Sequence, residues 1–453
     1  MLTRTRDRHF KFFKLKPVQI LALGFAALIL LGAILLMLPI SSKSGAYTSF
    51  LDSLFTATSA TCVTGLVVVD TGTHWSTFGQ IVIITLIQIG GLGFMTFSTL
   101  IAILLGKRVS LKERLIMREA YNAFDIQGLV KLVIYVLTIT FTIEGVGALI
   151  LTTQFAQDFP IGTSIYYGIF HSISSFCNAG FDLLGGFNSY TSYVTNPVLS
   201  LTIAALIVLG GIGFFVIAEI IGHKRRKKYS LHTKVVVITT LLLIVVGAVL
   251  FFILEHNNPK TMGDLSVRDQ VVASIFASVT PRTAGANTIS TTDMTIASQF
   301  LTVILMFIGA SPGSTGGGIK TTTMMILLMT IVSVINGREE TEIMKKRLNK
   351  AAVYRAIAIT FISFVLVSIV TMILAITQKG SFMQFIYEAT SAFGTVGLSL
   401  GLTPTLTPIG KIAIIITMYA GRLGPLTLVL AFAYRQRLSN TSIRYPEDKI
   451  IVG

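Results

Sequence analysis

Charged residues are scarce in this sequence, because Asp, Glu, Lys and Arg together make up only 12% of its 453 residues. A soluble domain carries about 25% charged residues, so the composition argues against a soluble globular protein. Hydrophobic residues make up 53% of the chain. We therefore expect an all-α polytopic membrane protein. The apolar runs that approach or exceed the roughly 20 residues needed to cross a bilayer are 17–38, 78–105, 198–221, 235–254 and 356–376.

Cysteine and histidine are also scarce, with two and six residues respectively. Two cysteines at apolar positions, Cys62 and Cys177, do not make a disulfide framework. A membrane-embedded enzyme would need clustered His, Asp, Glu or Ser side chains, and His171 stands alone, which favours a packing role. We therefore expect no enzyme activity, no cofactor and no metal cofactor site. The acid–histidine pairs spaced by four residues fall in an expected outer loop and beside a basic loop: Asp70/His74 and Glu219/His223.

Acidic residues are outnumbered by basic ones, 20 to 36, which gives a net charge of +16. The basic residues lie between alternate apolar runs rather than over one face, which argues against nucleic-acid binding. This is the positive-inside pattern, and it predicts that both termini are cytoplasmic. The first apolar run is too long for a cleavable signal peptide. The basic groups lie in 4–16, 107–118, 224–234, 338–355 and 435–449.

One plan recurs four times between the basic groups. A long apolar helix is followed by a short segment rich in Gly, Ser and Thr, and then by a second long apolar helix. An internal repeat of this kind defines the architecture of a chain. The first repeat includes a cytoplasmic N-terminus and the last a cytoplasmic C-terminal tail. The predicted repeats are 1–128, 129–233, 234–350 and 351–453.

The four short segments align without gaps on one glycine: Gly65, Gly180, Gly285 or Gly397. A bulky residue stands ten positions before this glycine in every copy, and a serine stands six before it in three copies. Cys62 and Cys177 share one register, which argues against a redox role and favours packing behind a loop. The aligned segments are FTATSATCVTGL (55–66), FHSISSFCNAGF (170–181), IFASVTPRTAGA (275–286) and YEATSAFGTVGL (387–398).

These segments are too short to cross a bilayer and too apolar at their start to be ordinary loops. A half-helix that returns as extended backbone fits both properties, and such backbone lines an aqueous path or is buried in protein. Half-helix C-termini directed at one centre favour a cation there, and a ring of carbonyls can coordinate it. We therefore expect four membrane–pore-loop–membrane repeats in a pseudo-fourfold arrangement around one central pore. The candidate filter residues are Cys62, Val63, Thr64, Gly65, Cys177, Asn178, Ala179, Gly180, Arg282, Thr283, Ala284, Gly285, Gly394, Thr395, Val396 and Gly397.

The fourth segment, GTVG, resembles the TVG core of potassium-channel filters, whereas each other copy keeps one glycine, as expected of a wider or weaker filter. With IGGLGF (89–94), LGGIGF (209–214), AGRLGP (420–425) and the closing RYPEDKIIVG, the whole chain resembles the Trk/Ktr/HKT superfamily of potassium transporters, and within it the Ktr-type membrane subunit. The resemblance implies potassium uptake across a bacterial cell membrane. It also implies a homodimer in membrane lipid, gated by a cytoplasmic nucleotide-binding ring.

The return run of the third repeat is interrupted in FIGASPGSTGGGIKT (307–321), where Pro312 and five glycines cannot continue an ordinary helix. A broken helix at membrane depth lines a cavity or is buried. We interpret it as a gate loop just inside the filter, as the resemblance also implies; a packing kink is the alternative. Arg422, in the register of Gly91 and Gly211, is expected to face this path, the alternative being an arginine that reaches toward water. The candidate gate residues are Gly309, Ala310, Ser311, Pro312, Gly313, Ser314, Thr315, Gly316, Gly317, Gly318, Lys320 and Arg422.

Two nucleotide-binding readings fail on spacing. GSTGGGIKT is no phosphate-binding loop, because Ile319 separates Gly318 from Lys320 and no strand precedes it. IGGLGF and LGGIGF lack the third glycine of a dinucleotide fingerprint. Four acids near membrane depth favour packing or interfacial roles, with cation attraction or filter support as the alternative for the last two: Glu144, Glu219, Asp182 and Glu388.

Potassium permeation, alone or coupled to sodium, is thus the expected function. A conventional secondary transporter also uses repeats and broken helices, but it predicts paired repeats around a midplane substrate site. Four equal units, each with a filter glycine, do not match that plan. The sequence leaves open sodium coupling, the strength of the preference for potassium over sodium, and the nucleotide and identity of the regulatory partner.

Overall fold

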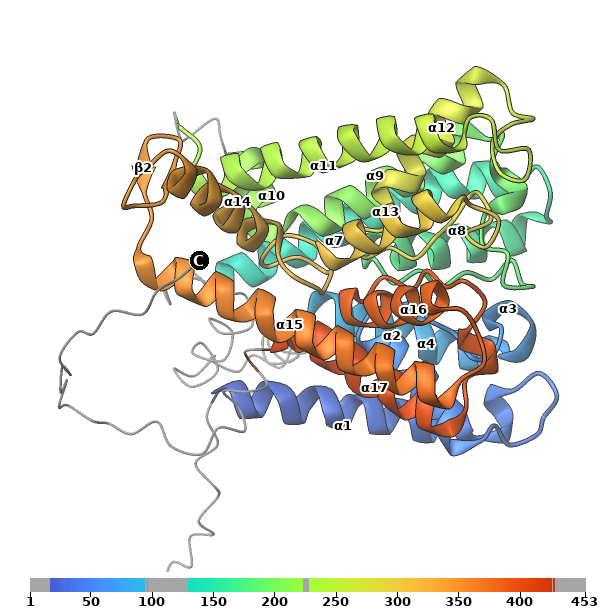
Figure 1. Ribbon diagram of the computed structural model, residues 1–453. Coiled ribbons are helices and arrows are strands. Elements are labelled where there is room, and N and C mark those ends of the chain that lie inside the picture. The colour runs from blue at the N-terminus through green and yellow to red at the C-terminus, as the bar shows by residue number, and fades with distance from the viewer. Residues whose placement is uncertain (1–16, 94–95, 97–128, 223–227, 426, 428–453) are drawn as a thin grey trace, which may run out of the picture.

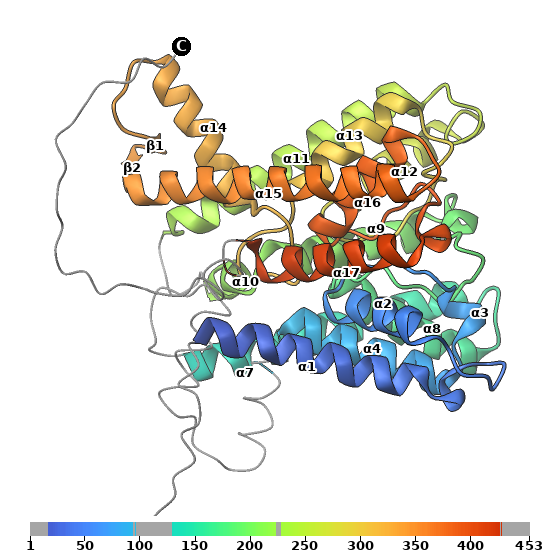
Figure 2. The same ribbon diagram turned by 60° about the horizontal axis from the view of Figure 1, so that its bottom comes forward.

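The computed structural model describes residues 17–93, 96, 129–222, 228–425 and 427. Many of the basic residues used above, and the closing RYPEDKIIVG, lie outside these residues. The described chain is a bundle of helices that run along a common direction (Figure 1). One end carries α3 (Thr71–His74), and the other carries an antiparallel hairpin of β1 (Glu342–Ile343) and β2 (Lys346–Arg347) (Figures 1 and 2). We call these the α3 end and the hairpin end.

Four helices begin the four units, and each is long and apolar enough to cross a membrane. Their apolar side chains are not confined to one face: α11 buries Val236 and Phe251 but exposes Leu241, Val245 and Val249. A helix that is hydrophobic all round fits a membrane or a large protein core. These long helices are α1 (Pro17–Met37), α7 (Leu129–Phe155), α11 (Leu231–Glu255) and α15 (Lys350–Thr377).

Each long helix is followed by a helix of 12 to 16 residues that does not reach across a bilayer. Three of these half-helices begin at a serine whose hydroxyl accepts from a backbone N–H three residues on: Ser49, Ser266 and Ser381. Each half-helix packs against the long helix that precedes it. The half-helices are α2 (Phe50–Thr61), α8 (Ile161–Phe176), α12 (Val267–Val279) and α16 (Phe382–Gly394).

Each unit then returns in a third helix that starts at a polar cap: Ser76, Asn196, Thr295 or Thr407. The return helix of one unit packs on the half-helix of the next, as α4 on α8, α9 on α12 and α13 on α16. The last return helix, α17, packs on the first half-helix, α2, so the contacts close a cycle. The return helices are α4 (Thr77–Leu92), α9 (Pro197–Ile212), α13 (Ile296–Phe307) and α17 (Pro408–Leu423).

The expectation of an unbroken second long helix is wrong in the second repeat. The predicted run 198–221 is two helices, α9 and α10 (Phe214–Ile221), which meet at an angle of 98°. The helices α4, α9 and α17 all stop before a glycine with positive φ: Gly93, Gly213 or Gly424. The third repeat breaks at the same stage, after Phe307, and resumes as α14 (Thr321–Ile335). An L-residue rarely adopts these glycine conformations, so the chain turns where its apolar composition continues.

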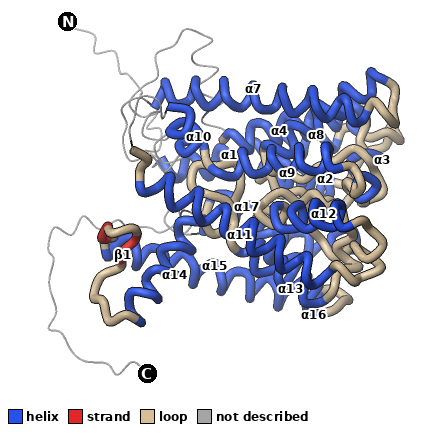
Figure 3. The backbone as a smooth tube through the Cα atoms, turned by 90° about the horizontal axis from the view of Figure 1, so that it is seen from above, coloured by secondary structure: helices blue, strands red, loops and turns tan. Residues whose placement is uncertain are grey.

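The remaining elements are short. Seen from above, Figure 3 shows loops in tan gathered at the α3 end and the red strands at the opposite end. The turns of 3₁₀-helix are η1 (Pro39–Ser41), η2 (Thr191–Tyr193) and η4 (Thr403–Thr405).

Candidate functional site

The four aligned glycines lie together in a closed ring. A Cβ atom placed on Gly65 would lie 3.1 Å from the Cα of Gly180, and one on Gly180 would lie 3.1 Å from the Cα of Gly285. The same construction joins Gly285 to Gly397 at 3.0 Å and Gly397 back to Gly65 at 2.9 Å. All four have φ between 69° and 96°. We call them the glycine ring; neither the φ angles nor the space tolerates a side chain.

The backbone before each ring glycine is bent in the same way. Two positions before it, each segment has a residue with φ between 51° and 71°, in the left-handed region. That conformation is uncommon for any side chain and unfavourable for β-branched residues, yet three of the four are valine or threonine. The segments thus share one backbone shape despite different sequences. These residues are Val63, Asn178, Thr283 and Thr395.

Hydroxyl groups of the half-helices hold the first and fourth segments. Ser59 Oγ accepts from the N–H of Gly65 at 3.1 Å, and Ser391 Oγ accepts from the N–H of Gly397 at 3.1 Å. Both serines stand six positions before the ring glycine. Their recurrence was visible in the sequence, whereas their role was not.

In the second and third segments the hydroxyl of the half-helix donates a hydrogen bond to the segment instead of accepting one. Ser174 Oγ donates to the carbonyl of Phe181 at 2.6 Å. In the third segment Val279 occupies the serine register, and Thr280 Oγ1 donates to the carbonyl of Ala286 instead. Sequence reasoning missed Thr280, because its register is displaced by one residue.

Three of the predicted filter side chains are buried in the protein around the ring segments: Cys62, Cys177 and Arg282. Cys62 and Cys177 are buried and free of disulfides. Arg282 is also buried, and its Nη2 donates to Thr240 Oγ1 on α11 at 3.2 Å. This long helix lies behind the third segment. The backbone of Arg282 is therefore part of the segment, whereas its guanidinium group lies between the segment and α11.

A polar cavity of about 600 Å³ opens on the ring from the α3 end. All four ring glycines line it, together with outer-loop segments from each unit. Three carboxylates line the cavity, from Asp70, Asp182 and Asp293, against one lysine, Lys260. The ring therefore meets a polar, acid-rich vestibule on this side.

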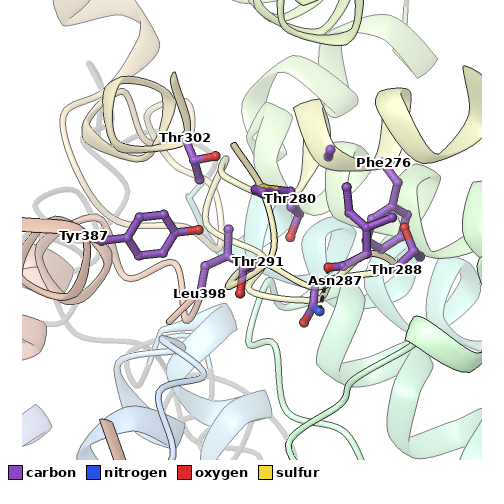
Figure 4. Close-up of a pocket in the computed structure, with 11 residues that line it drawn as sticks. Phe276, Thr280, Asn287, Thr288, Thr291, Thr302, Tyr387 and Leu398 are labelled. Atoms are coloured by element: carbon purple, nitrogen blue, oxygen red, sulfur yellow. Dashed lines mark hydrogen bonds between the residues drawn. The ribbon is translucent and has the colours of Figure 1, made fainter. Parts of the chain in front are cut away.

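A much smaller cavity, of about 10 Å³, lies behind the ring between the third and fourth units. Figure 4 shows Tyr387 reaching toward it from one side and Phe276 and Thr288 from the other. Within the described structure the hydroxyl of Thr288 has no hydrogen-bond partner. Its size suits about one water molecule, so it is no second route for a hydrated ion.

Residues 308–320, which join α13 to α14 and which we call the α13–α14 loop, approach the ring segments away from the vestibule. The loop is closed on itself by the N–H of Gly309, which donates to Ile319 O at 2.8 Å. It also bonds to the second and fourth units. These bonds are Ser311 N to Gly211 O (3.0 Å), Thr315 Oγ1 to Phe176 O (3.3 Å) and Gly317 N to Thr395 Oγ1 (3.0 Å).

Arg422 connects this loop to the first unit. Its Nη1 donates to the carbonyl of Thr315, and its Nη2 donates to the carbonyls of Gly90 and Gly91, the latter at 3.1 Å. Lys320 Nζ donates to Gly316 O at 2.7 Å. Two cationic side chains thus lie on the side of the ring opposite the vestibule, both bonded to the loop or its neighbours.

The paired glycines of the return helices have a packing role. A side chain on Gly90, Gly210 or Gly421 would overlap a backbone carbonyl at the end of the half-helix in the same unit. Close backbone approach is a role that only glycine fills. The carbonyls in question belong to Thr61, Phe176 and Phe393.

The four acids noted from the sequence all have hydrogen-bond partners inside the protein. Glu144, Glu219 and Glu388 join neighbouring elements, whereas Asp182 accepts within its own loop. Within the described residues no group of three or more His, Cys, Asp or Glu side chains is placed to bind a metal. The bonds are Gln88 Nε2 to Glu144 (3.1 Å), Leu184 N to Asp182 (3.0 Å), Ser230 N to Glu219 (2.8 Å) and Ser399 Oγ to Glu388 (2.9 Å).

Comparison with known proteins finds one family over nearly the whole chain. The TrkH family model, described as a cation transport protein, matches residues 3–441. The Ktr system potassium uptake protein B of Bacillus subtilis is 43% identical over 452 residues, covering 100% of both chains. The potassium/sodium uptake protein NtpJ of Enterococcus hirae is 43% identical over 97% of this chain and 98% of its own. The solved structure of the potassium transporter TrkH from Vibrio parahaemolyticus matches with a TM-score of 0.73 at 18% identity, over 95% of this chain and 87% of that one.

Proposed function

Because the chain belongs to the TrkH family of cation transport proteins, we propose that it is the potassium-conducting membrane subunit of a bacterial uptake system. The observation that carries this proposal is the closed glycine ring, in which four backbone segments of one shape surround a single point. Backbone carbonyls arranged in this way can replace the hydration shell of potassium. The identity of the transported ion is inferred from two relatives, since both 43% identical proteins are named for potassium uptake.

The ring segments act as the selectivity filter in this proposal, one from each of the repeats 1–128, 129–233, 234–350 and 351–453. The contacts of each return helix with the next half-helix support a pseudo-fourfold arrangement. The vestibule concentrates cations, because Asp70, Asp182 and Asp293 outnumber Lys260 there. The wider filter expected from the single glycine of the first three segments leaves room for some sodium passage.

The α13–α14 loop is the gate. It bonds to Thr395 just below the ring and, through Arg422, to Gly90 and Gly91. A cation leaving the ring on this side meets the loop and the charges of Arg422 and Lys320. Charge-assisted bonds from a guanidinium are stronger than bonds between neutral groups, so Arg422 holds the loop in the closed position.

The working assembly in this proposal is a homodimer in the bacterial cell membrane, with both termini in the cytoplasm. A cytoplasmic nucleotide-binding ring docks at the hairpin end and moves the gate. The name of the B. subtilis relative, a Ktr system protein, supports such a partner. Because the relative NtpJ is named for both potassium and sodium uptake, sodium-coupled transport is the alternative mechanism to test.

Rubidium uptake into liposomes that contain the purified chain tests the function. We expect uptake that potassium inhibits at lower concentration than sodium does, and that needs no organic solute. Uptake of a small solute without rubidium would instead identify a conventional secondary transporter. Repeating the assay with and without sodium separates permeation from sodium-coupled transport.

A further inference from the structure

The same position of the half-helix carries a different side chain in each unit. It stands nine residues before the ring glycine and is Thr56, His171, Phe276 or Glu388. All four side chains are buried, with exposures of 0% or 1%. Only the second and fourth units place a group here that accepts hydrogen bonds from the segment on the vestibule side of the ring.

His171 makes two hydrogen bonds that together fix its protonation. Its Nδ1 lies 2.8 Å from the carbonyl of Tyr167, and its Nε2 accepts from the N–H of Leu183 at 3.0 Å. Since a carbonyl only accepts and an amide only donates, the ring is the neutral tautomer with the proton on Nδ1. Leu183 stands three residues beyond Gly180 of the ring. The bond from Leu183 to His171 therefore fixes the backbone of the second segment just after its ring glycine.

Glu388 makes the corresponding bonds in the fourth unit. Its carboxylate accepts from Ser399 Oγ at 2.9 Å and from the hydroxyl of Thr403. Ser399 stands two residues beyond Gly397, and its carbonyl accepts from Thr291 Oγ1 of the third unit at 2.8 Å. The carboxylate therefore fixes the fourth segment where it leaves the ring and where it touches its neighbour.

The other two units lack this support. The Thr56 hydroxyl has no hydrogen-bond partner within the described structure. Phe276 lines the small cavity behind the ring instead. Because the ring runs in the order Gly65, Gly180, Gly285 and Gly397, the supported segments alternate with the unsupported ones and face each other across it.

We infer that His171 and Glu388 are positioning residues that fix two opposite sides of the ring and thereby set which cation it accepts. The inference rests on the proposed role of the ring as a filter. Selectivity depends on the distance and number of the carbonyls around the ion. Removing either acceptor leaves a buried N–H or hydroxyl unpaired, so the chain beyond the ring glycine shifts and the carbonyls shift with it.

Paired variants separate the hydrogen bond from the packing. His171→Phe keeps an aromatic ring among Phe155 and Tyr190 but removes the acceptor, and phenylalanine already occupies this position in the third unit. His171→Gln keeps an acceptor. Glu388→Met and Glu388→Gln make the same pair in the fourth unit. Thr56→Val is the matched control, since it removes a hydroxyl that holds nothing.

The measurement is the ratio of rubidium to sodium flux in liposomes at equal amounts of folded protein. We expect His171→Phe and Glu388→Met to lower this ratio several-fold, mainly by admitting sodium, while both glutamine variants and Thr56→Val stay near wild type. If the wild type prefers rubidium and the Phe and Met variants keep its ratio, the inference is overturned while the proposed function stands. A Thr56→Val ratio that falls equally would also overturn it. A wild type without preference would overturn the proposed function itself. Should one variant not fold, the pair in the other unit decides.

Discussion

At the scale of single residues, two separate features require glycine at the ring positions. Each has a φ that L-residues avoid, and each faces the backbone of the next segment at contact distance. A side chain at Gly397 would meet the carbonyl of Thr64 and the Cα of Gly65, at 2.9 Å from the latter. The segment has no room to yield without moving its neighbour around the ring.

Gly397→Ser is therefore expected to weaken the preference for potassium over sodium while the protein still inserts in the membrane. Gly45→Ser is the matched control, because Gly45 also has a positive φ but nothing lies within 4 Å of a Cβ placed on it. Ion competition of rubidium uptake gives the measurement. Unchanged ion preference in a folded Gly397→Ser protein would contradict a role for the glycine ring in ion selectivity.

Arg422 is the other residue with a distinct role. It bonds to the carbonyl of Thr315 in the α13–α14 loop and to Gly90 and Gly91 at the break of α4. Removing it deletes both the bonds and a positive charge near the path, whose repulsion of a cation is large in a low dielectric.

Arg422→Ala is expected to raise maximal rubidium flux and to reduce the contrast between gated and ungated states. Arg422→Lys should be intermediate, since it keeps the charge but loses the planar fork. Arg268→Ala makes the same chemical change in the exposed first turn of α12, away from both the loop and the hairpin end, and should have no effect. Equal flux in wild type and Arg422→Ala, at matched protein density in liposomes, would mean that the arginine does not bear on the path.

At the scale of elements, the α13–α14 loop is longer than the break in the second unit. Gly213 alone separates α9 from α10, whereas residues 308–320 separate α13 from α14. The extra residues fill the region below the ring, where they bond to Gly211, Phe176 and Thr395.

Deletion of residues 313–318 is expected to raise basal rubidium flux and to reduce dependence on the cytoplasmic partner. The deletion removes the bond to Thr395 and the carbonyl that Arg422 contacts. Flux is compared with wild type after gel filtration has shown correct assembly. Persistently low flux in an assembled deletion protein would contradict a gating role for the loop.

The elements themselves were partly predictable. The half-helices could be predicted because four aligned segments were too short to cross a bilayer. The breaks after Leu92 and Ile212 could not, because the apolar composition continues through them and a positive φ at Gly93 or Gly213 leaves no mark in hydropathy. Only the third break, rich in glycine and containing Pro312, was visible.

At the scale of the whole molecule, the bundle is closed by contacts between its two ends in sequence. The last return helix, α17, packs on α2, and Lys411 Nζ lies 2.5 Å from Asp52 Oδ1 across this junction. The Tyr419 hydroxyl donates to Ala22 O at 2.6 Å. The sequence predicted four repeats but not which repeats touch, because the partners lie more than 300 residues apart.

A double-mutant cycle on Lys411→Met and Asp52→Asn measures what this closure contributes to stability. We expect a coupling of about 1 kcal/mol, because the pair is only partly shielded from solvent. Thermal unfolding in detergent gives the values. Asp269→Asn is the control for the loss of the bond between the serine and the aspartate at the start of the half-helix. Asp269 accepts from the Ser266 hydroxyl just as Asp52 does from Ser49. A coupling of zero would show that the ion pair does not hold the closure.

The central claim is that cations pass through the glycine ring. Anomalous diffraction from crystals grown in rubidium tests it most directly, because it locates the ion independently of flux. The account predicts a peak at the centre of Gly65, Gly180, Gly285 and Gly397, with carbonyl oxygens around it, that sodium weakens less than potassium does. Rubidium bound elsewhere in the bundle, with an intact but empty ring, would contradict the account.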